Sequence, residues 1–334
     1  MSAMKKVIND PAMIVREVTL GLVEAYQGKV KQVEGKSILV KTEFPSNTVA
    51  LLIGGGSGHE PLFGGFIGEN LADGVVSGNI FAAPTPDLIL MATKAVDQGK
   101  GVLYVYGNYA GDNMNFDIAS ELASAEGIET RTVRVWDDVA ASPPDQIEER
   151  RGIAGDLFVI KIAGAVSAVS DNLEEVFRVA VKARDNTRSM GVALAPGTHP
   201  ETGKAFFELG DNEIELGMGL HGEPGVSREE LIKADELVEK LMARILEDLP
   251  FKPGDDVCLL VNDLGSTTMT ELLIVNRKVR QILRDKDISV HDTAMGGYCT
   301  SQEMAGFSIT LMKLDDELKE YYNMPADSLA YTKV

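Results

Sequence analysis

The residues best suited to chemistry in this 334-residue chain are two of its four histidines, which share an unusual setting. His59 lies in residues 54–61 (GGGSGHEP), and His221 lies in residues 217–225 (GMGLHGEPG). Glycine has no side chain and accepts positive φ, so a glycine-rich backbone can approach a small ligand closely. An imidazole can act as base, acid or nucleophile near neutral pH. We therefore expect the two histidine segments to serve one site built from two parts of the chain.

Two carboxylates accompany these histidines. Asp112 follows the stretch 106–111 (YGNYAG) and precedes an expected helix at 113–125. It fits two compatible roles, the N-cap of that helix and a general base at the end of a strand. Glu223 follows His221 by two residues and is a candidate to orient its imidazole, which can attack a carbonyl carbon.

Two glycine-containing segments leave alternatives open. Residues 54–61 match neither GxxxxGK[ST] nor GxGxxG followed by a helix, so they do not indicate a nucleotide site. They fit a cradle for a small polar molecule or a tight turn with a solvent-exposed histidine, and four glycines in five residues favour the cradle. Residues 150–155 (RRGIAG) fit a phosphate site and, equally, ion pairs with Glu148, Glu149 or a partner.

The remaining reactive side chains predict no further chemistry. His199 and His291 lack glycine neighbours and offer no zinc ligand set, so we expect structural or surface roles for both. The 51 acidic residues contain no DxDxD-type cluster, and we expect no metal site. Cys258 and Cys299 lie in apolar or glycine-rich contexts, which fit buried thiols in a reducing compartment.

Composition narrows the classes of function. A net charge of −19 repels phosphate backbones and anionic lipid, which disfavours nucleic-acid and membrane-surface roles. The N-terminus has no apolar core of signal-peptide length, and the longest apolar runs are far short of a membrane span. We expect a soluble cytoplasmic protein.

These side chains must be positioned by regular elements. In the first half, strands expected at 48–53, 101–106 and 128–135 alternate with helices, an order typical of a parallel sheet. Ligands bind such sheets beyond the carboxyl ends of the strands, where residues 54–61 and 107–112 both lie. The helices are expected at 11–26, 87–97, 113–125, 156–169 and 173–184.

The pattern changes in the second half, and the length of the chain allows two domains. We expect an α/β fold with two domains, each a sheet flanked by helices: 1–186 with the His59 segment and Asp112, and 187–334 with His221. The later strands are expected at 189–194, 213–216, 257–262, 288–293 and 307–314, and the later helices at 228–248 and 268–285.

Six motifs in a fixed order carry a family resemblance. They are residues 54–61, 83–87 (APTPD), 108–116 (NYAGDNMNF), 150–155, 217–225 and 262–266 (NDLGS). Together they resemble the dihydroxyacetone kinase family, and in particular its substrate-binding K subunit. The resemblance extends from the N-terminus to about residue 315 and implies the two-domain fold of that subunit.

The resemblance also implies roles for single residues. His221 matches the histidine that adds to the ketone carbon of the substrate and forms a covalent hemiaminal, which distinguishes ketoses from polyols such as glycerol. His59 matches a histidine that hydrogen-bonds the substrate, and Asp112 matches the aspartate that accepts the proton of the hydroxyl. Gly56 matches a backbone contact to the ligand, and the expected substrate-binding set is Gly56, Ser57, Gly58 and Ala83.

The implied partners follow from the same family. Single-chain members append a helical nucleotide-binding L domain, so we expect this chain to need a separate L subunit that carries ADP or ATP with Mg²⁺. In one branch a phosphotransferase-system protein recharges that ADP, and in another ATP exchanges directly. The resemblance implies a homodimer and no cofactor held by this chain itself.

Two departures from the family pattern bear on the substrate. Ala82 and Ala83 stand where members that use dihydroxyacetone commonly carry Thr-Ser, and Tyr106 stands where a lysine is common. We expect both changes near the pocket edge and hence a different short ketose, such as erythrulose. The alternative is a non-catalytic ketose sensor that co-activates a transcription regulator; retention of His59, Asp112 and His221 together favours the kinase.

Overall fold

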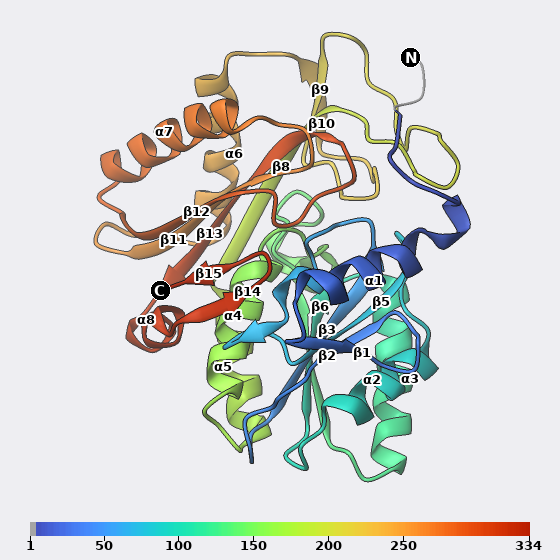
Figure 1. Ribbon diagram of the computed structural model, residues 1–334. Coiled ribbons are helices and arrows are strands. Elements are labelled where there is room, and N and C mark those ends of the chain that lie inside the picture. The colour runs from blue at the N-terminus through green and yellow to red at the C-terminus, as the bar shows by residue number, and fades with distance from the viewer. Residues whose placement is uncertain (1–4) are drawn as a thin grey trace. The chain divides into compact units, whose positions relative to one another are not determined.

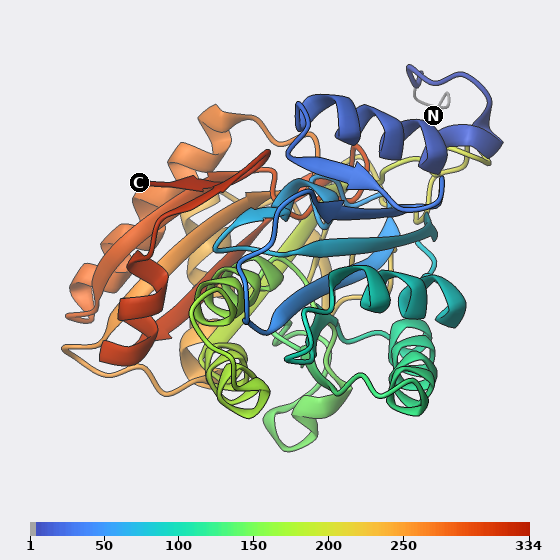
Figure 2. The same ribbon diagram turned by 60° about the horizontal axis from the view of Figure 1, so that its bottom comes forward.

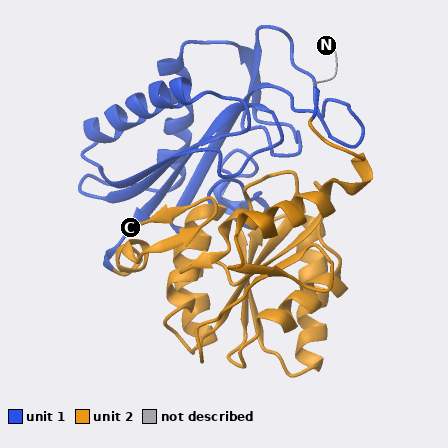
Figure 3. Ribbon diagram, viewed as in Figure 1, with its two compact units in different colours: residues 1–6, 136–155, 186–316 blue, residues 7–135, 156–185, 317–334 orange. Residues whose placement is uncertain are grey.

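The computed structural model describes residues 5–334, which divide into two compact units (Figure 3). Unit 2 comprises residues 7–135, 156–185 and 317–334. Unit 1 comprises residues 136–155 and 186–316, with Lys5 and Lys6. The chain passes from unit 2 to unit 1 between residues 185 and 186. Two segments contradict the expected division into 1–186 and 187–334. Residues 136–155 belong to unit 1, and residues 317–334 belong to unit 2.

Long-range backbone pairing explains this correction. Ser189 N donates to Asp137 O at 2.7 Å and Val139 N donates to Ser189 O at 3.0 Å, so residues 136–155 start alongside strand β8 (Thr187–Ala195) of unit 1. Near the C-terminus, β14 (Ala326–Ser328) pairs with β4 (Gly68–Glu69) of unit 2. Pairings between segments so distant in sequence leave no mark in local periodicity.

Unit 2 is built on a six-stranded mixed sheet with the order β1-β2-β5-β3-β6-β7. Strands β5, β3, β6 and β7 are parallel, and β2 and β1 add an antiparallel edge. The strands expected at 48–53, 101–106 and 128–135 are β3, β6 and β7, while β5 had not been predicted. The bounds are β1 (Val30–Gln32), β2 (Ile38–Lys41), β3 (Ala50–Ser57), β5 (Gly74–Ile80), β6 (Val102–Gly107) and β7 (Thr130–Val135).

Helices cover both faces of this sheet (Figures 1 and 2). Helices α2 (Pro86–Val96) and α3 (Ala110–Ala125) pack together on one face, over a core that includes Tyr104, Tyr106 and Phe116. Helices α4 (Asp156–Ser167) and α5 (Leu173–Asp185) contact β3, β6 and β7 without entering that core. Burial on both faces accounts for the continuous apolar runs of β3 and β6.

The rest of unit 2 comprises α1 and a small second sheet. Helix α1 (Ile14–Ala25) contacts the β1–β2 hairpin and follows the short η1 (Pro11–Met13). Strands β14 and β15 (Thr332–Lys333) follow α8 (Asp316–Asn323) and join β4 in a small sheet with the order β15-β14-β4. Within residues 5–334, no helix is both long enough and apolar enough to cross a bilayer.

Unit 1 is built on a second six-stranded sheet, with the order β10-β9-β8-β13-β11-β12, in which only β11 and β12 are parallel. Helices α6 (Ala234–Asp248) and α7 (Met269–Asp285) pack on one face of it (Figure 1). The helix expected at 228–248 begins later because residues 227–230 pair with β9 as a strand. The further bounds are β9 (Glu213–Leu216), β10 (Ser227–Glu230), β11 (Asp256–Asp263), β12 (Ser289–Gly296) and β13 (Ala305–Leu314).

A buried ion cluster in unit 1 gives Arg150, the first residue of the segment 150–155, a partner other than the expected Glu148 or Glu149. The Arg150 side chain is fully buried, and its Nη1 donates to Asp248 Oδ1 at 2.8 Å while its Nε donates to Ser142 O at 2.7 Å. Arg188 donates to the same carboxylate. Arg150 therefore fixes the segment 142–150 to the end of α6, and it is buried away from any phosphate that could bind from solution.

Candidate functional site

The glycine-rich segment 54–61 is strand and turn rather than a loop beyond the strand. Strand β3 continues to Ser57, so Gly54, Gly55 and Gly56 lie within it. A Cβ on Gly56 would lie 2.8 Å from the backbone nitrogen of Ala82, and a Cβ on Gly54 would lie 2.5 Å from Val76 O. Close approach of neighbouring backbone therefore requires glycine at these positions, whatever ligand binds there.

His59 is buried, which excludes the interpretation as a turn with a solvent-exposed histidine. Only 4% of its surface is exposed, and its ring lies 5.1 Å from the ring of Phe81, measured between centroids. Phe81 adopts a left-handed φ of 58°, a strained conformation for an aromatic residue, and its N–H donates to Ser57 O at 2.8 Å. The turn that carries Phe81 thus holds the imidazole against the end of β3.

The polar atoms of Ser57 and Gly58 are already engaged. Ser57 Oγ donates to Gly78 O at 2.8 Å, so this hydroxyl can only accept a hydrogen bond from a further partner. Gly58 N donates to the Glu60 carboxylate at 3.1 Å, and burial raises the pKa of Glu60 above its usual value. A ligand contact of the Gly58 amide would have to replace this internal hydrogen bond.

Ala83 lies in the turn between β5 and α2, and this turn connects the His59 segment with α3. Its Cβ lies 3.4 Å from where a Cβ on Gly111 would be, and Asn115 Nδ2 donates to Pro84 O at 2.8 Å. Since Gly56 also packs against the Phe81–Ala82 backbone, the turn touches both β3 and the first turn of α3. The structure therefore brings Gly56, Ser57, His59, Ala83 and the start of α3 to one edge of the unit 2 sheet.

Asp112 lies within the first turn of α3, not at its N-cap. The helix begins at Ala110 after Tyr109, three residues earlier than expected, which makes Asp112 its third residue. The side chain is buried, with 8% of the residue exposed. In the first turn of α3 the carboxylate lies near the backbone N–H groups that a helix N-terminus leaves without intrahelical partners.

Tyr106 lies in the core beneath α3. Its side chain is fully buried, and its ring stacks on Phe116 of α3 with centroids 4.3 Å apart. Burial raises its pKa to about 12. The phenol is also close enough to Asp112 for that carboxylate to act on its pKa.

His221 lies in unit 1, in the connection between β9 and β10, and Glu223 binds its ring. The two atoms Nδ1 and Glu223 Oε1 are 3.1 Å apart, and Glu223 Oε2 accepts from the backbone N–H of His221 at 2.9 Å. Although burial acts to raise it, the hydrogen bond and charge of His221 lower the pKa of Glu223 to about 2. An ionised carboxylate only accepts hydrogen bonds, so whenever the imidazole is neutral its proton is on Nδ1 and its lone pair is on Nε2.

Arg151 is a residue of this site that the sequence pattern did not single out for this role. Its Nη2 donates to Gly217 O at 3.0 Å and to Asp138 Oδ2 at 2.8 Å. Burial raises the pKa of Asp138 to about 6, although the charge of Arg151 opposes this. In the local sequence Arg151 is marked only by its neighbours Arg150 and Gly152. That pattern does not identify Gly217, 66 residues away, as its partner.

The other two histidines have local partners of their own. His199 Nδ1 accepts from Glu201 N at 3.3 Å, and His291 Nδ1 lies 3.7 Å from Asp256. No group of three His, Cys, Asp or Glu residues within residues 5–334 is arranged to hold a metal ion.

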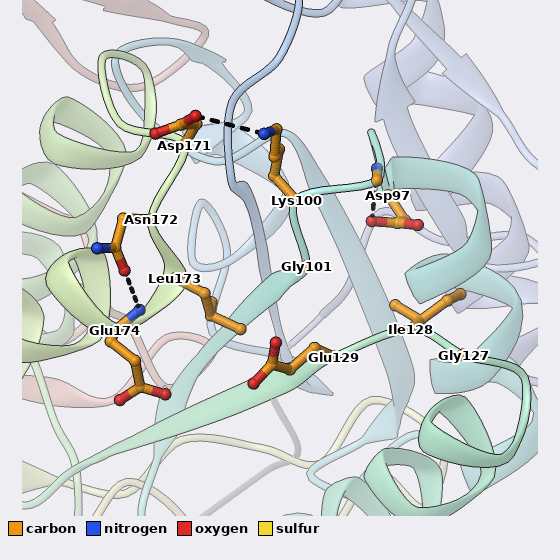
Figure 4. Close-up of a pocket in the computed structure, with 11 residues that line it drawn as sticks. Asp97, Lys100, Gly101, Gly127, Ile128, Glu129, Asp171, Asn172, Leu173 and Glu174 are labelled. Carbon is orange, nitrogen blue, oxygen red and sulfur yellow. Dashed lines mark hydrogen bonds and ion pairs between the residues drawn. The ribbon is translucent and has the colours of Figure 1, made fainter.

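A pocket of about 570 Å³ opens at the opposite edge of the unit 2 sheet (Figure 4). It lies at the start of β6 and β7, where Lys100 pairs with Asp171 at 3.3 Å. It contains none of the predicted site residues, and four carboxylates line it, from Asp97, Glu129, Asp171 and Glu174. Its position at the amino ends of the strands separates it from the edge that carries His59 and Asp112.

Comparison with known proteins decides the family. The model of the Dak1 domain matches residues 20–330. The chain belongs to the dihydroxyacetone kinase (Dak1) family. Its two-domain α/β fold is the family's fold, as expected from the sequence: a solved structure described as a dihydroxyacetone kinase operon co-activator superposes with a TM-score of 0.90 at 30% identity, covering 95% of this chain and 98% of that one.

The chain is also similar to two curated members of the family along nearly all of its length. The chain is 44% identical to the PTS-dependent dihydroxyacetone kinase 2, dihydroxyacetone-binding subunit DhaK, of Listeria innocua, over 99% of this chain and 100% of that protein. It is 38% identical to the L-erythrulose kinase of Pectobacterium atrosepticum, over 99% of this chain and 56% of that protein.

The turn between β5 and α2 provides a test of the site's architecture. A Cβ on Gly78 would lie 1.9 Å from Ala82 O and 2.6 Å from the carbonyl carbon of Ala83. We expect Gly78→Ala to lower the free energy of unfolding by about 1–3 kcal/mol, because the backbone of the turn must move. Gly21→Ala is the control: this glycine lies in α1 with nothing within 4 Å, so alanine should stabilise the helix by about 0.5–1 kcal/mol. Urea unfolding of both variants measures this, and equal effects would contradict it.

Proposed function

We propose that this chain is the ketose-binding subunit of a dihydroxyacetone-type kinase. The observation that carries the proposal is the hydrogen bond between Glu223 and His221 Nδ1, because it places the imidazole lone pair on Nε2. Membership of the Dak1 family over most of the chain supports it, as does similarity along the full length of a dihydroxyacetone-binding subunit.

The proposed first step is covalent capture of the ketose. Nε2 of His221 attacks the carbonyl carbon; the C–N bond forms and the π bond of the carbonyl breaks. The carbonyl oxygen takes up a proton and the Nδ1 proton leaves towards Glu223, so the net reaction adds N–H across C=O. Glycerol has no carbonyl carbon and cannot react, which gives the subunit selectivity without a size filter.

The second step is phosphorylation of a terminal hydroxyl of the captured ketose. Asp112, in the first turn of α3, accepts the proton of that hydroxyl as the hydroxyl oxygen attacks the phosphoryl group. His59 hydrogen-bonds the ketose, and Gly56, Ser57, Gly58 and Ala83 complete the proposed substrate contacts. Fixing the hydroxyl supplies the proximity effect of the reaction.

A separate L subunit is the proposed source of the phosphoryl group, with ADP or ATP and Mg²⁺ bound to it. The Listeria relative matches this chain along its whole length and is named as PTS-dependent, which supports a phosphotransferase-system protein as the donor to that subunit. We further propose that the chain acts as a homodimer in the cytoplasm, in glycerol metabolism.

The second candidate function is that of a ketose sensor that co-activates transcription. The similarity to a co-activator of a dihydroxyacetone kinase operon favours it, since that protein shares the fold along nearly its whole length. A sensor needs the covalent adduct but no base for the hydroxyl. The experiments below separate the two functions by testing adduct formation and phosphorylation independently.

The covalent step predicts a mass shift. We expect dihydroxyacetone and erythrulose to raise the intact mass of the protein by the mass of one ketose, and glycerol to leave it unchanged. His221→Ala should abolish the adduct, whereas the control His199→Ala should keep it. Absence of an adduct with every short ketose tested would contradict covalent capture.

The base role of Asp112 predicts a separation of two measurements. With an L subunit and a phosphoryl donor, Asp112→Asn should lower turnover by about a hundredfold or more while leaving the adduct intact. Asp117→Asn is the matched control on α3, because this exposed carboxylate pairs with Arg134 at 2.6 Å instead. Unchanged turnover in Asp112→Asn would refute the base role. An adduct that no L subunit can phosphorylate would favour the sensor.

Ala83 is the proposed determinant of ketose preference. We expect Ala83→Ser to increase kcat/KM for dihydroxyacetone relative to erythrulose by about fivefold, the effect of one net hydrogen bond of about 1 kcal/mol. The neighbouring exposed Ala82 gives the matched control, Ala82→Ser, which should leave the ratio unchanged. The ratio is measured with both ketoses in competition, and a shift of equal size in both variants would contradict this role.

A further inference from the structure

A side chain behind the His221 segment joins it to a buried carboxylate. Arg151 donates to Asp138 Oδ2 through Nε at 3.1 Å and through Nη2 at 2.8 Å, and the same Nη2 donates to Gly217 O at 3.0 Å. The side chain of Asp138 is 1% exposed and that of Arg151 is 13% exposed. One guanidinium thus bridges a fixed acid and the first residue of the segment that carries His221.

The carboxylate end of this bridge is anchored to the sheet of unit 1. Asp138 Oδ1 accepts from Ala140 N at 3.0 Å, and Asp138 N donates to Arg151 O at 3.2 Å. The next residue, Val139, donates to Ser189 O of β8 at 3.0 Å. The position of Asp138 is therefore set by a central strand.

The other end reaches the pair His221–Glu223. A Cβ on Gly219 would lie 2.6 Å from Arg151 Nη1 and 2.2 Å from Glu223 Oε2, so both side chains pack against this glycine. Gly219 N also donates to Glu223 O at 3.0 Å. The guanidinium consequently supports the backbone on which Glu223 and His221 are mounted, without being part of the reacting pair.

We propose that Arg151 is a positioning residue for His221: it holds the segment 217–223 so that Glu223 can fix the Nδ1 proton and Nε2 can meet a carbonyl carbon. This inference rests on the proposed function, in which His221 captures the ketose. It predicts that loss of Arg151 weakens adduct formation while Asp112 and the phosphoryl transfer that follows remain intact.

The first test separates KM from kcat. In Arg151→Met with an L subunit and a phosphoryl donor, we expect KM for the ketose to rise and the rate of adduct formation to fall, each by about tenfold or more, with kcat changed less. Arg151→Lys keeps a charge for Asp138 but lacks the planar fork, and should recover part of the loss. Wild-type KM and adduct rate in a folded Arg151→Met would overturn the proposal.

Arg150→Lys is the matched control, because Arg150 is also buried but pairs with Asp248. It should lower stability while leaving KM and adduct rate unchanged. The variant Asp138→Asn covers the case in which Arg151→Met fails to fold. If both residues act through one bridge, the effects of Asp138→Asn and Arg151→Lys on KM will be less than additive, and full additivity would overturn the bridge.

A second measurement needs no substrate. Nitrogen and proton NMR of imidazole-labelled protein reports the tautomer of each of the four histidines, with His221 assigned from His221→Ala. We expect a fixed Nδ1–H tautomer in the wild type and an average of two tautomers in Arg151→Met. A His221 spectrum that is the same in Arg151→Met as in the wild type would overturn the positioning role, whether or not the wild type captures a ketose. A wild type that shows the fixed tautomer but forms no adduct would count against the proposed function alone.

Discussion

A carboxylate can only accept a hydrogen bond, and that constraint decides the chemistry of His221. Because Glu223 lies 3.1 Å from Nδ1, a neutral imidazole must carry its proton there, and Nε2 is left with the electron pair. The same carboxylate also accepts the backbone N–H of His221, so ring and backbone are fixed by one side chain. His221 and Glu223, only two residues apart, can form both hydrogen bonds because Gly219, Gly222 and Gly225 allow the chain to turn tightly between β9 and β10.

In unit 2 the corresponding constraint is space. Gly54 and Gly56 of β3 are required by the approach of Val76 and of the Phe81–Ala82 backbone, and Gly78 is required by the approach of Ala82 O. These contacts draw the turn between β5 and α2 onto the end of β3, which buries His59 against Phe81. Residues 54–61 look like a ligand cradle in the sequence, but their glycines are required first by the close packing of neighbouring segments. Any site at this edge of the sheet depends on that packing.

Periodicity predicted what depends on local sequence. The apolar runs of β3, β6 and β7 and their alternation with helices identified a parallel sheet and the edge at which Asp112 lies. It did not identify β5, whose glycines interrupt the apolar pattern, nor the antiparallel pairing of β10 that shortens α6. The membership of residues 136–155 in unit 1 depends on hydrogen bonds to Ser189. Helix α3 begins at Ala110, after Tyr109, so Asp112 lies inside the helix and does not cap it. Partners such as Asp248 for Arg150 are set by tertiary structure and have no local signature.

The two departures from the family pattern differ in what they can affect. Tyr106 stacks on Phe116 and is fully buried, so any influence on a ligand must pass through the position or electrostatics of α3. Ala83 lies against the first turn of the same helix, where Gly111 leaves room beside it. A hydroxyl at residue 83 would be within reach of the edge that carries Asp112, whereas a lysine at residue 106 would have to bury a charge or displace Phe116. Ala83 is therefore the substituted position that lies against the first turn of α3, whereas Tyr106 belongs to the core beneath that helix.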